Sequence, residues 1–169
     1  MRVYLATDHS GFELKEHLKK VLTEKGYTVE DCGAYTYDKD DDYPDFIAKA
    51  SEMVSKNTND RAIVIGGSGE AEAMAANKFP NVRAALFYSP QAPPQEADVT
   101  GRKSNDPYEI VRLSRQHNNA NVLSLGARFL SMDEAAEAVE IWLKEPFSED
   151  PRHVRRIEKI KKIEQELRQ

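Results

Sequence analysis

The chain of 169 residues fits one ordinary domain, large enough to bury a hydrophobic core without disulfide bonds or a structural metal. Its single cysteine, Cys32, excludes an internal disulfide and any multi-cysteine metal site. Cys32 lies at the end of a predicted strand, where a buried structural thiol is favoured over a reactive one. The net charge of −5 argues against a nucleic-acid-binding surface. No apolar stretch approaches the roughly 20 residues of a membrane helix, and the N-terminus lacks the apolar core of a signal peptide. We therefore expect a cytoplasmic protein that binds neither nucleic acid nor membranes.

Short apolar runs alternate with amphipathic segments along the chain, a pattern typical of β-α units that form a parallel sheet. Five strands are predicted at 2–7, 27–32, 61–66, 82–88 and 121–125. They lack strict alternation of apolar and polar residues, as expected when helices cover both faces of the sheet. Right-handed crossovers then place the carboxyl ends of the strands, and with them the expected ligand site, along one edge.

Helical spacing of apolar residues marks the segments between these strands. The two clearest stripes are Leu14, Leu18, Val21 and Leu22, and Phe46, Ile47, Ala50 and Val54. Ser10 and Glu13 are three residues apart and predict a capping box at the start of the first helix. Further helices near 132–144 and 152–168 would complete an open three-layer αβα sandwich.

One stretch, residues 89–106, has turn and loop composition without periodicity. A loop of this length in a compact domain is either functional or disordered. We therefore expect a single domain over residues 1–169 with an inserted loop at 89–106.

A glycine-rich turn, Gly66, Gly67, Ser68 and Gly69, joins the third predicted strand to a helix-like segment. Backbone N–H groups at such a turn can hold an anion. The alternative is a tight turn that needs glycine only for its dihedral angles. The turn matches neither a phosphate-binding loop that ends in Gly-Lys-Ser/Thr nor a complete dinucleotide fingerprint.

Two carboxylates, Glu70 and Glu72, lie in the first turn of that helix, where interaction with the helix dipole alone could explain them. Residues two apart on a helix do not face each other, so only one is expected to point at a substrate. We favour Glu72 as a general base, because the glycine turn could stabilise the enediolate left when a proton is removed from carbon.

Two histidine segments could add to this site. Asp8 and His9 end the first strand, at the same sheet edge as the glycine turn, although a capping or loop role is also open. His117 ends a predicted helix, where it could either interact with the helix dipole or act as an acid or base. The asparagines Asn118 and Asn119 that follow could stop that helix.

Charged residues elsewhere allow two interpretations. Arg152 and Arg156 are four apart on the last helix and could clamp a phosphate, or they could belong to a solvated basic face. The acidic run 38–42 resembles a calcium loop only superficially, since Tyr43 replaces the required glycine. We interpret it as a surface loop.

Together these segments resemble the ribose-5-phosphate isomerase B family, which includes related sugar-phosphate isomerases. The ordered set covers nearly the whole chain: Asp8-His9-Ser10-Gly11, Asp42-Tyr43-Pro44, Gly67-Ser68-Gly69, Ala75-Ala76-Asn77-Lys78, Ser114-Arg115-Gln116-His117-Asn118, Gly126-Ala127-Arg128 and Arg152-His153-Val154-Arg155-Arg156. Each motif alone is weak, whereas the set is highly specific.

The resemblance implies a Rossmann-like sandwich with an extra C-terminal helix and aldose–ketose isomerisation of a small phosphorylated sugar without metal or cofactor. It also implies a homodimer with composite sites, and leaves open whether dimers pair into tetramers. Many family members have a catalytic cysteine where this chain has Gly66. This sequence resembles a second branch that uses a glutamate at the position of Glu72.

By the same resemblance, each site residue receives a role. Catalytic roles fall to Glu72, to Asp8 and His117 in ring opening, and to Ser68 nearby. Gly67, Gly69 and Asn118 would stabilise the enediolate, with Ala71 beside them. The phosphate would be held by His9, Arg128, Arg152 and Arg156, and Tyr43 would line the pocket.

Three departures concern the identity of the substrate: Ala71 stands where the family usually has glycine, Glu70 adds a charge, and residues 89–106 are inserted. The main hypothesis is interconversion of ribose 5-phosphate and ribulose 5-phosphate through an enediolate. Its rivals are isomerisation of another four- to six-carbon phosphosugar and phosphosugar binding without catalysis. A structural scaffold is a third rival, which would have no use for the arginine pair.

Overall fold

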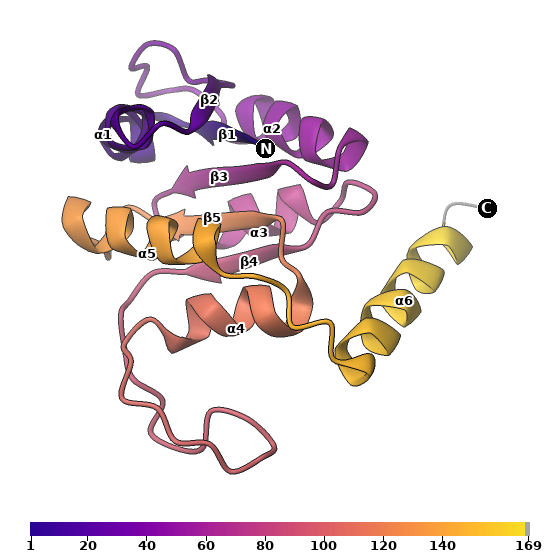
Figure 1. Ribbon diagram of the computed structural model, residues 1–169. Helices are drawn as coiled ribbons and strands as arrows, with labels where there is room; N and C mark the ends of the chain where they lie inside the picture. Colours follow the sequence, from indigo (N-terminus) through magenta and orange to yellow (C-terminus); the bar gives the residue numbers. More distant parts are fainter. Residues whose placement is uncertain (168–169) are drawn as a thin grey trace.

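The structure is a computed structural model and describes residues 1–167. Five parallel strands form one sheet in the order β2-β1-β3-β5-β4 (Figure 1). They are β1 (Arg2–Thr7), β2 (Thr28–Asp31), β3 (Arg61–Gly66), β4 (Ala84–Phe87) and β5 (Val122–Gly126). The five predicted strands and their parallel arrangement are therefore confirmed, and β2 and β4 at the sheet edges are shorter than predicted.

Helices cover both faces of this sheet. α1 (Phe12–Glu24), α4 (Glu109–Asn118) and α5 (Met132–Lys144) pack on one face. α2 (Pro44–Lys56) and α3 (Glu70–Ala76) pack on the other. The predicted three-layer αβα sandwich is thus confirmed.

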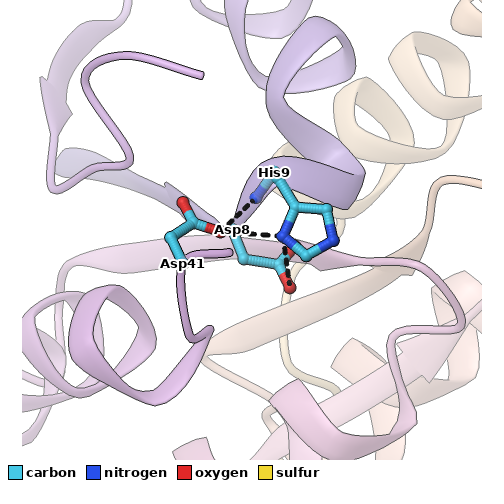
Figure 2. Close-up of side chains that lie close together, drawn as sticks. All are labelled: Asp8, His9 and Asp41. Carbon is cyan, nitrogen blue, oxygen red and sulfur yellow. Dashed lines mark hydrogen bonds and ion pairs between the residues drawn. The ribbon is translucent and has the colours of Figure 1, made fainter. Parts of the chain in front are cut away.

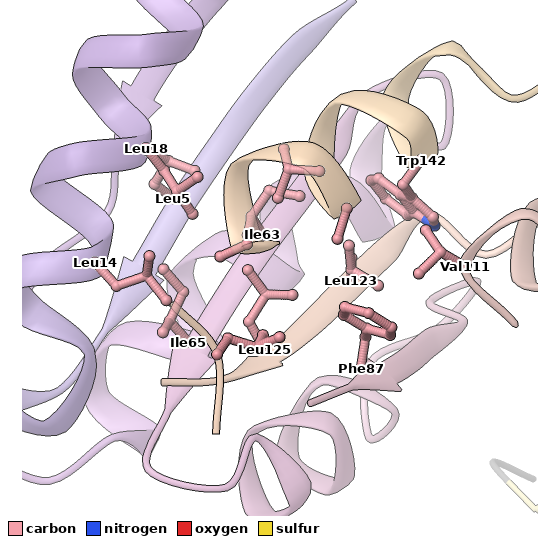
Figure 3. Close-up of a cluster of buried hydrophobic side chains, with 14 of the residues drawn as sticks. Leu5, Leu14, Leu18, Ile63, Ile65, Phe87, Val111, Leu123, Leu125 and Trp142 are labelled. Carbon is pink, nitrogen blue, oxygen red and sulfur yellow. The ribbon is translucent and has the colours of Figure 1, made fainter. Parts of the chain in front are cut away.

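Both faces of the central strands are buried, which explains why the sequence lacks alternation. In β3, Ile63 and Ile65 join the core below α1, α4 and α5, whereas Val64 joins the core below α2. Figure 3 shows the larger core, in which Leu14 and Leu18 of α1 contribute side chains from the predicted apolar stripe. The second predicted stripe is confirmed as well, since its members in α2 are buried or pack against the smaller core.

The predicted capping box at Ser10 and Glu13 is wrong. A short 3-10 turn, η1 (His9–Gly11), precedes α1, and its cap is Asp8, whose Oδ1 accepts a hydrogen bond from the Ser10 amide at 2.9 Å. The Ser10 hydroxyl also donates to this carboxylate. It is therefore engaged before the helix begins, and α1 starts at Phe12 without a side-chain cap.

The last helix, α6 (Pro151–Glu166), leaves the sandwich and projects from it (Figure 1). The predicted extra C-terminal helix is confirmed. The expectation that it completes the sandwich is wrong, because α6 is rich in charged residues and buries only His153. The predicted end at 168 lies outside the described residues. Within residues 1–167, no helix is both long and apolar enough to cross a bilayer.

The predicted loop 89–106 has no helix or strand, and it runs from β4 to α4 (Figure 1). The buried carboxylate of Glu109 accepts hydrogen bonds from Arg102 and from the Ser104 hydroxyl. Arg102 also donates to Asp98 at 3.0 Å. These charge-assisted bonds tie the loop to the first turn of α4.

Trp142 of α5 joins two of the covering helices. Its side chain is 0% exposed, and its Nε1 donates to the Ser114 hydroxyl of α4 at 3.1 Å. We expect Trp142→Ala to lower the free energy of unfolding by about 3–5 kcal/mol, because it leaves a cavity and removes this hydrogen bond. Urea denaturation measures the change. The control Met74→Ala alters a side chain that is 66% exposed, and it should shift stability by less than about 0.5 kcal/mol.

Candidate active site

The sheet has its topological switch point between β1 and β3. The chain passes from β1 to β2 on one side of β1 and then crosses back to β3 on the other side. Ligands of open α/β sheets bind outside the carboxyl ends of the strands at such a point. Thr7 and Ile65 are paired near the ends of these two strands. Asp8 and the glycine turn follow directly, so the prediction that they share one sheet edge is confirmed.

The glycine turn depends on the missing side chain of Gly69. Its φ of +79° lies in the left-handed region, and a Cβ there would lie 2.8 Å from the backbone of Leu125. Both the dihedral angle and the close approach require glycine. Within the described chain, the amides of Gly67, Ser68 and Gly69 donate no hydrogen bond, so the turn has donors free for a ligand.

The carboxylate of Glu72, in α3, lies against the end of β3. The residue is 4% exposed, and Oε2 has no hydrogen-bond partner within the described residues. A Cβ built on Gly66 would lie 1.9 Å from Glu72 Oε1. The carboxylate thus occupies the space in which a side chain at position 66 would begin.

Burial raises the pKa of the Glu72 carboxyl, and the negative charge of Asp8 raises it further. Asp8 is itself buried. Glu70, by contrast, is exposed. The structure thus buries one of the two glutamates and exposes the other.

His9 lies beside two carboxylates (Figure 2). Asp41 Oδ1 accepts a hydrogen bond from the His9 amide and is bonded to Nδ1 of its ring, each at 2.8 Å. Asp8 Oδ2 lies 3.9 Å from the same Nδ1. The hydrogen bond to Asp41 raises the pKa of His9, and burial opposes this effect.

Asp41 corrects the interpretation of residues 38–42 as only a surface loop. Its neighbours Asp40 and Asp42 are exposed, but the side chain of Asp41 is only 10% exposed. Within residues 1–167, Asp8, His9 and Asp41 form a group whose metal-binding atoms approach within 4.8 Å of one another. Ligands of these types bind divalent cations in other proteins, but we assign no cation site to this group. Since Nδ1 and Oδ1 are bonded to each other, the observed arrangement is a hydrogen-bonded histidine–aspartate pair.

Arg128 and Tyr43 border this site. The Arg128 amide donates to the Gly67 carbonyl at 3.1 Å, and a Cβ on Gly67 would lie 3.1 Å from the guanidinium carbon of Arg128. Tyr43 is half-buried at the start of α2, two residues after Asp41. We refer to Asp8, His9, Ser68, Glu72 and Arg128 as the strand-end cluster.

A second group gathers where α4 meets α6. The rings of His117 and His153 lie 4.1 Å apart, and Arg152 Nη2 is 3.1 Å from His153 Nε2. Burial lowers the pKa of His117, and the neighbouring His153 and Arg152 lower it further. Asn118 and Arg156 line one groove beside α6. We refer to His117, Asn118, Arg152 and Arg156 as the helix-end cluster.

Within one chain, the two clusters lie at opposite ends of the strands, the strand-end cluster at their carboxyl ends and the helix-end cluster near their amino ends. α4 ends at Asn118, and the φ of +45° at its C-cap, Asn119, confirms the predicted asparagine stop. The Asn121 carbonyl then accepts a hydrogen bond from Ala62, near the start of β3. Gly66 and Gly126 are paired at the other end of the same strands. The structure therefore brings Asp8, His9, Ser68, Glu72 and Arg128 together, but not with His117, Asn118, Arg152 or Arg156.

Sequence reasoning missed two residues that touch predicted site residues, Asp41 and His153. His153 is buried against His117, and Ser148 Oγ lies 3.0 Å from its Nδ1. Its position beside Arg152 was the available signal, since it lies in the basic motif. Asp41 had no such signal.

Cys32 is buried as predicted, and burial raises the pKa of its thiol to about 11.

A doubly wound sheet with an acid–base cluster at its switch point defines an α/β protein with an enzyme-like site. The sequence model of the Ribose/Galactose Isomerase family matches residues 3–106 and 99–160, so the chain belongs to this family. The family resemblance seen in the sequence is thereby confirmed.

Relatives of known name are similar over almost the whole chain. The ribose-5-phosphate isomerase B of Mycolicibacterium paratuberculosis is 39% identical over 164 residues, which cover 97% of this chain and 92% of the relative. A crystal structure of ribose-5-phosphate isomerase B from Mycoplasma genitalium with bound ribulose-5-phosphate has a TM-score of 0.84 and 37% identity, and covers 98% of this chain and 97% of that one. The corresponding Clostridium thermocellum structure has a TM-score of 0.83 and 36% identity, with 99% of each chain covered. These structures support the Rossmann-like fold.

Burial of the Glu72 carboxylate, whose Oε2 has no hydrogen-bond partner within the described residues, predicts a measurable cost in stability. Since its pKa is raised in the folded state, the protonated form favours folding below the unfolded-state pKa, and this advantage is lost as pH rises through the folded-state pKa. At pH 8 we expect Glu72→Gln to be more stable than the wild type by about 0.5–2 kcal/mol. The difference should shrink as pH falls through the ordinary carboxyl pKa of 4.5.

Urea denaturation of both proteins across this pH range measures the effect. Glu70→Gln is the matched control, because it removes the same charge from an exposed position two residues away. Equal stabilisation by both substitutions at pH 8 would show that net charge, rather than the burial of Glu72, is responsible.

Proposed function

We propose that this protein interconverts ribose 5-phosphate and ribulose 5-phosphate by moving a proton between C2 and C1 of the open-chain sugar. The main support is the Glu72 carboxylate, which is buried beside a turn with free amides and whose Oε2 has no hydrogen-bond partner within the described residues. Family membership and the ribulose-5-phosphate bound to the Mycoplasma genitalium relative support the reaction and the substrate.

Glu72 is the general base in this proposal. Its raised pKa brings the carboxyl closer to neutral pH, which suits a group that must accept and return a proton. A cysteine at position 66 would compete with the carboxylate for the same space. The contact at Gly66 therefore supports a glutamate base in place of the cysteine.

The glycine turn would stabilise the enediolate intermediate. When Glu72 takes the C2 proton, negative charge moves to the oxygens on C1 and C2 and forms an enediolate. The amides of Gly67 and Gly69 would stabilise this charge, aided by the partner subunit's Asn118, and Ala71 would add its amide nearby. The C2 hydroxyl proton passes to the C1 oxygen, and return of the abstracted proton to C1 then gives the ketose. Asp8, the Ser68 hydroxyl and the partner subunit's His117 would assist opening of the furanose ring.

The phosphate anchors the other end of the substrate. His9 and Arg128 would contact it from one chain, and Arg152 and Arg156 from the partner, while Tyr43 lines the pocket. A dianion held in this way supplies binding energy remote from the reacting carbons, and this energy can position C1 and C2 at the base. Proton transfer between a carboxylate and carbon needs no metal or cofactor, so the proposal includes neither.

A homodimer with composite sites follows from the separation of the two clusters. Neither cluster alone provides a base, a ring-opening acid and a full phosphate site. α6 exposes Ile160, Ile163 and Leu167, which line a groove together with Asn118 and Arg156. An apolar row of this kind beside charged site residues is suited to a second copy of the chain, which would bring its strand-end cluster to the helix-end cluster.

The remaining parts of the proposal concern the chain as a whole. We infer a single cytoplasmic domain with an insertion at 89–106. The two family matches together span residues 3–160, which supports one domain. The charges of Asp98 and Arg102 in this loop influence His117. The loop could therefore adapt the site to another four- to six-carbon phosphosugar. Turnover across a panel of sugar phosphates tests this alternative, and no turnover of any five-carbon phosphate would contradict the main proposal.

Replacing the base should separate catalysis from binding. We expect Glu72→Gln to lower kcat by about 10²–10⁴, the usual contribution of a positioned general base, while ribose 5-phosphate still binds. Exchange of the C2 proton for solvent deuterium, followed by NMR, should be lost in parallel. Calorimetry measures the retained binding.

Glu70→Gln should keep kcat within about twofold, since its side chain is exposed. Wild-type protein that binds the sugar without proton exchange would indicate a non-catalytic binding protein. Exchange that persists in Glu72→Gln would exclude Glu72 as the base.

Composite sites predict complementation between inactive chains. A purified heterodimer of Glu72→Gln and His117→Ala chains should have about half of the wild-type activity, because one of its two sites contains no substitution. Two affinity tags allow its isolation. The control pairs Glu72→Gln with Asp8→Asn. Both substitutions affect the strand-end cluster, so each of the two sites contains one substitution. Activity should therefore stay at the level of the two singly substituted homodimers. Equal activity of the two heterodimers would contradict composite sites.

A further inference from the structure

The environment of Asp41 suggests a role for a residue that family membership and the proposed reaction leave unassigned. Its side chain is nine-tenths buried on a loop whose neighbouring aspartates are exposed. Among residues 1–167, Oδ1 hydrogen-bonds to His9 alone, through the amide and through Nδ1, both at 2.8 Å. Oδ2 is buried and has no hydrogen-bond partner within the described residues. A carboxylate kept in such surroundings is costly, and the interaction that offsets this cost is the one with His9.

The two bonds to one oxygen fix both the position and the protonation of the imidazole. A carboxylate only accepts hydrogen bonds, so Nδ1 must donate and carry a proton. The second ring nitrogen, Nε2, points away from both carboxylates (Figure 2). Because the His9 side chain is 30% exposed, this nitrogen can reach a ligand. Any proton on it makes the ring a cation.

We propose that Asp41 is a positioning residue, which holds His9 as an imidazolium with Nε2–H directed at the phosphate of the substrate. This inference rests on the proposed function, in which His9 contacts that phosphate. Asp41 itself does not touch the substrate and acts through the ring.

The other phosphate ligands are arginines, which keep their charge at all relevant pH values. His9 is thus the phosphate ligand whose charge depends on pH. Two carboxylates face the ring, Asp41 from the loop before α2 and Asp8 from the end of β1, and both favour the cation. The direction of the His9 pKa agrees, since the Asp41 hydrogen bond raises it. Asp41 would extend phosphate binding to higher pH.

The test substitutes Asp41→Asn, which keeps the size of the side chain and removes its charge. NMR of the imidazole carbon protons should show His9 titrating at least about one pH unit lower than in the wild type. The KM for ribose 5-phosphate should rise about tenfold at pH 8, with kcat within about twofold, because the loss falls on binding. The two KM values should converge as pH falls towards 6, because protonation of the ring in Asp41→Asn restores the cation.

Asp40→Asn is the matched control. It removes the same charge from the adjacent, exposed position and should leave the KM ratio near one at both pH values. An unchanged His9 titration in Asp41→Asn would overturn the proposal. So would a KM ratio that does not vary with pH, since a merely structural role of Asp41 would weaken binding equally throughout.

Inorganic phosphate separates this inference from the proposed reaction. Its affinity for wild-type and Asp41→Asn protein, measured by calorimetry at pH 6 and pH 8, should follow the same pattern without turnover. Wild-type protein that binds phosphate in this way but does not isomerise ribose 5-phosphate would refute the proposed function and leave the role of Asp41 intact. Turnover together with phosphate affinity that is equal in both proteins at pH 8 would refute the role of Asp41 alone.

Discussion

The missing side chain at Gly66 is the constraint on which the rest of the strand-end cluster depends. The last residue of β3 faces a space that any Cβ would fill, and the Glu72 carboxylate occupies this space instead. The carboxylate reaches it because Gly69, with a φ of +79°, turns the chain sharply from β3 into α3. One backbone turn thus sets both the place of the proposed base and the direction of its amide donors.

Charge is distributed in the proposed site according to the reaction. The groups near the reacting carbons, Glu72 and Asp8, are acidic and buried. The groups assigned to the phosphate are basic, and two of them lie on α6, outside the sandwich. A dianionic substrate would therefore be oriented with its phosphate away from the carboxylates, since the reverse orientation would bring like charges together.

Most of the fold could be predicted from the sequence, because its signals are local. The runs 2–7 and 61–66 coincide with β1 and β3, and burial of both faces explains their continuous apolar character. The strand-end cluster was also predictable, since the carboxyl ends of neighbouring parallel strands must meet. Helix geometry predicted that only one of Glu70 and Glu72 faces a substrate, and the glycine turn favoured Glu72. The structure buries Glu72 and exposes Glu70.

The parts that could not be predicted depend on long-range contacts. Asp41 and His9 are 32 residues apart, and no spacing rule links a loop carboxylate to a distant imidazole. The capping box failed because the Asp8 side chain, from the preceding strand end, engages Ser10 first. α6 has helical periodicity like the other helices, but too little apolar surface to hold it on the sheet.

The position of the two clusters at opposite ends of the strands also limits how copies of the chain can associate. A head-to-tail arrangement would leave one unpaired cluster at each end and could continue into a filament. A two-fold pair uses both clusters of both chains within one closed interface. α6 projects outward from the sandwich (Figure 1), so in the proposed dimer it could carry the helix-end cluster of one chain to the strand-end cluster of the other.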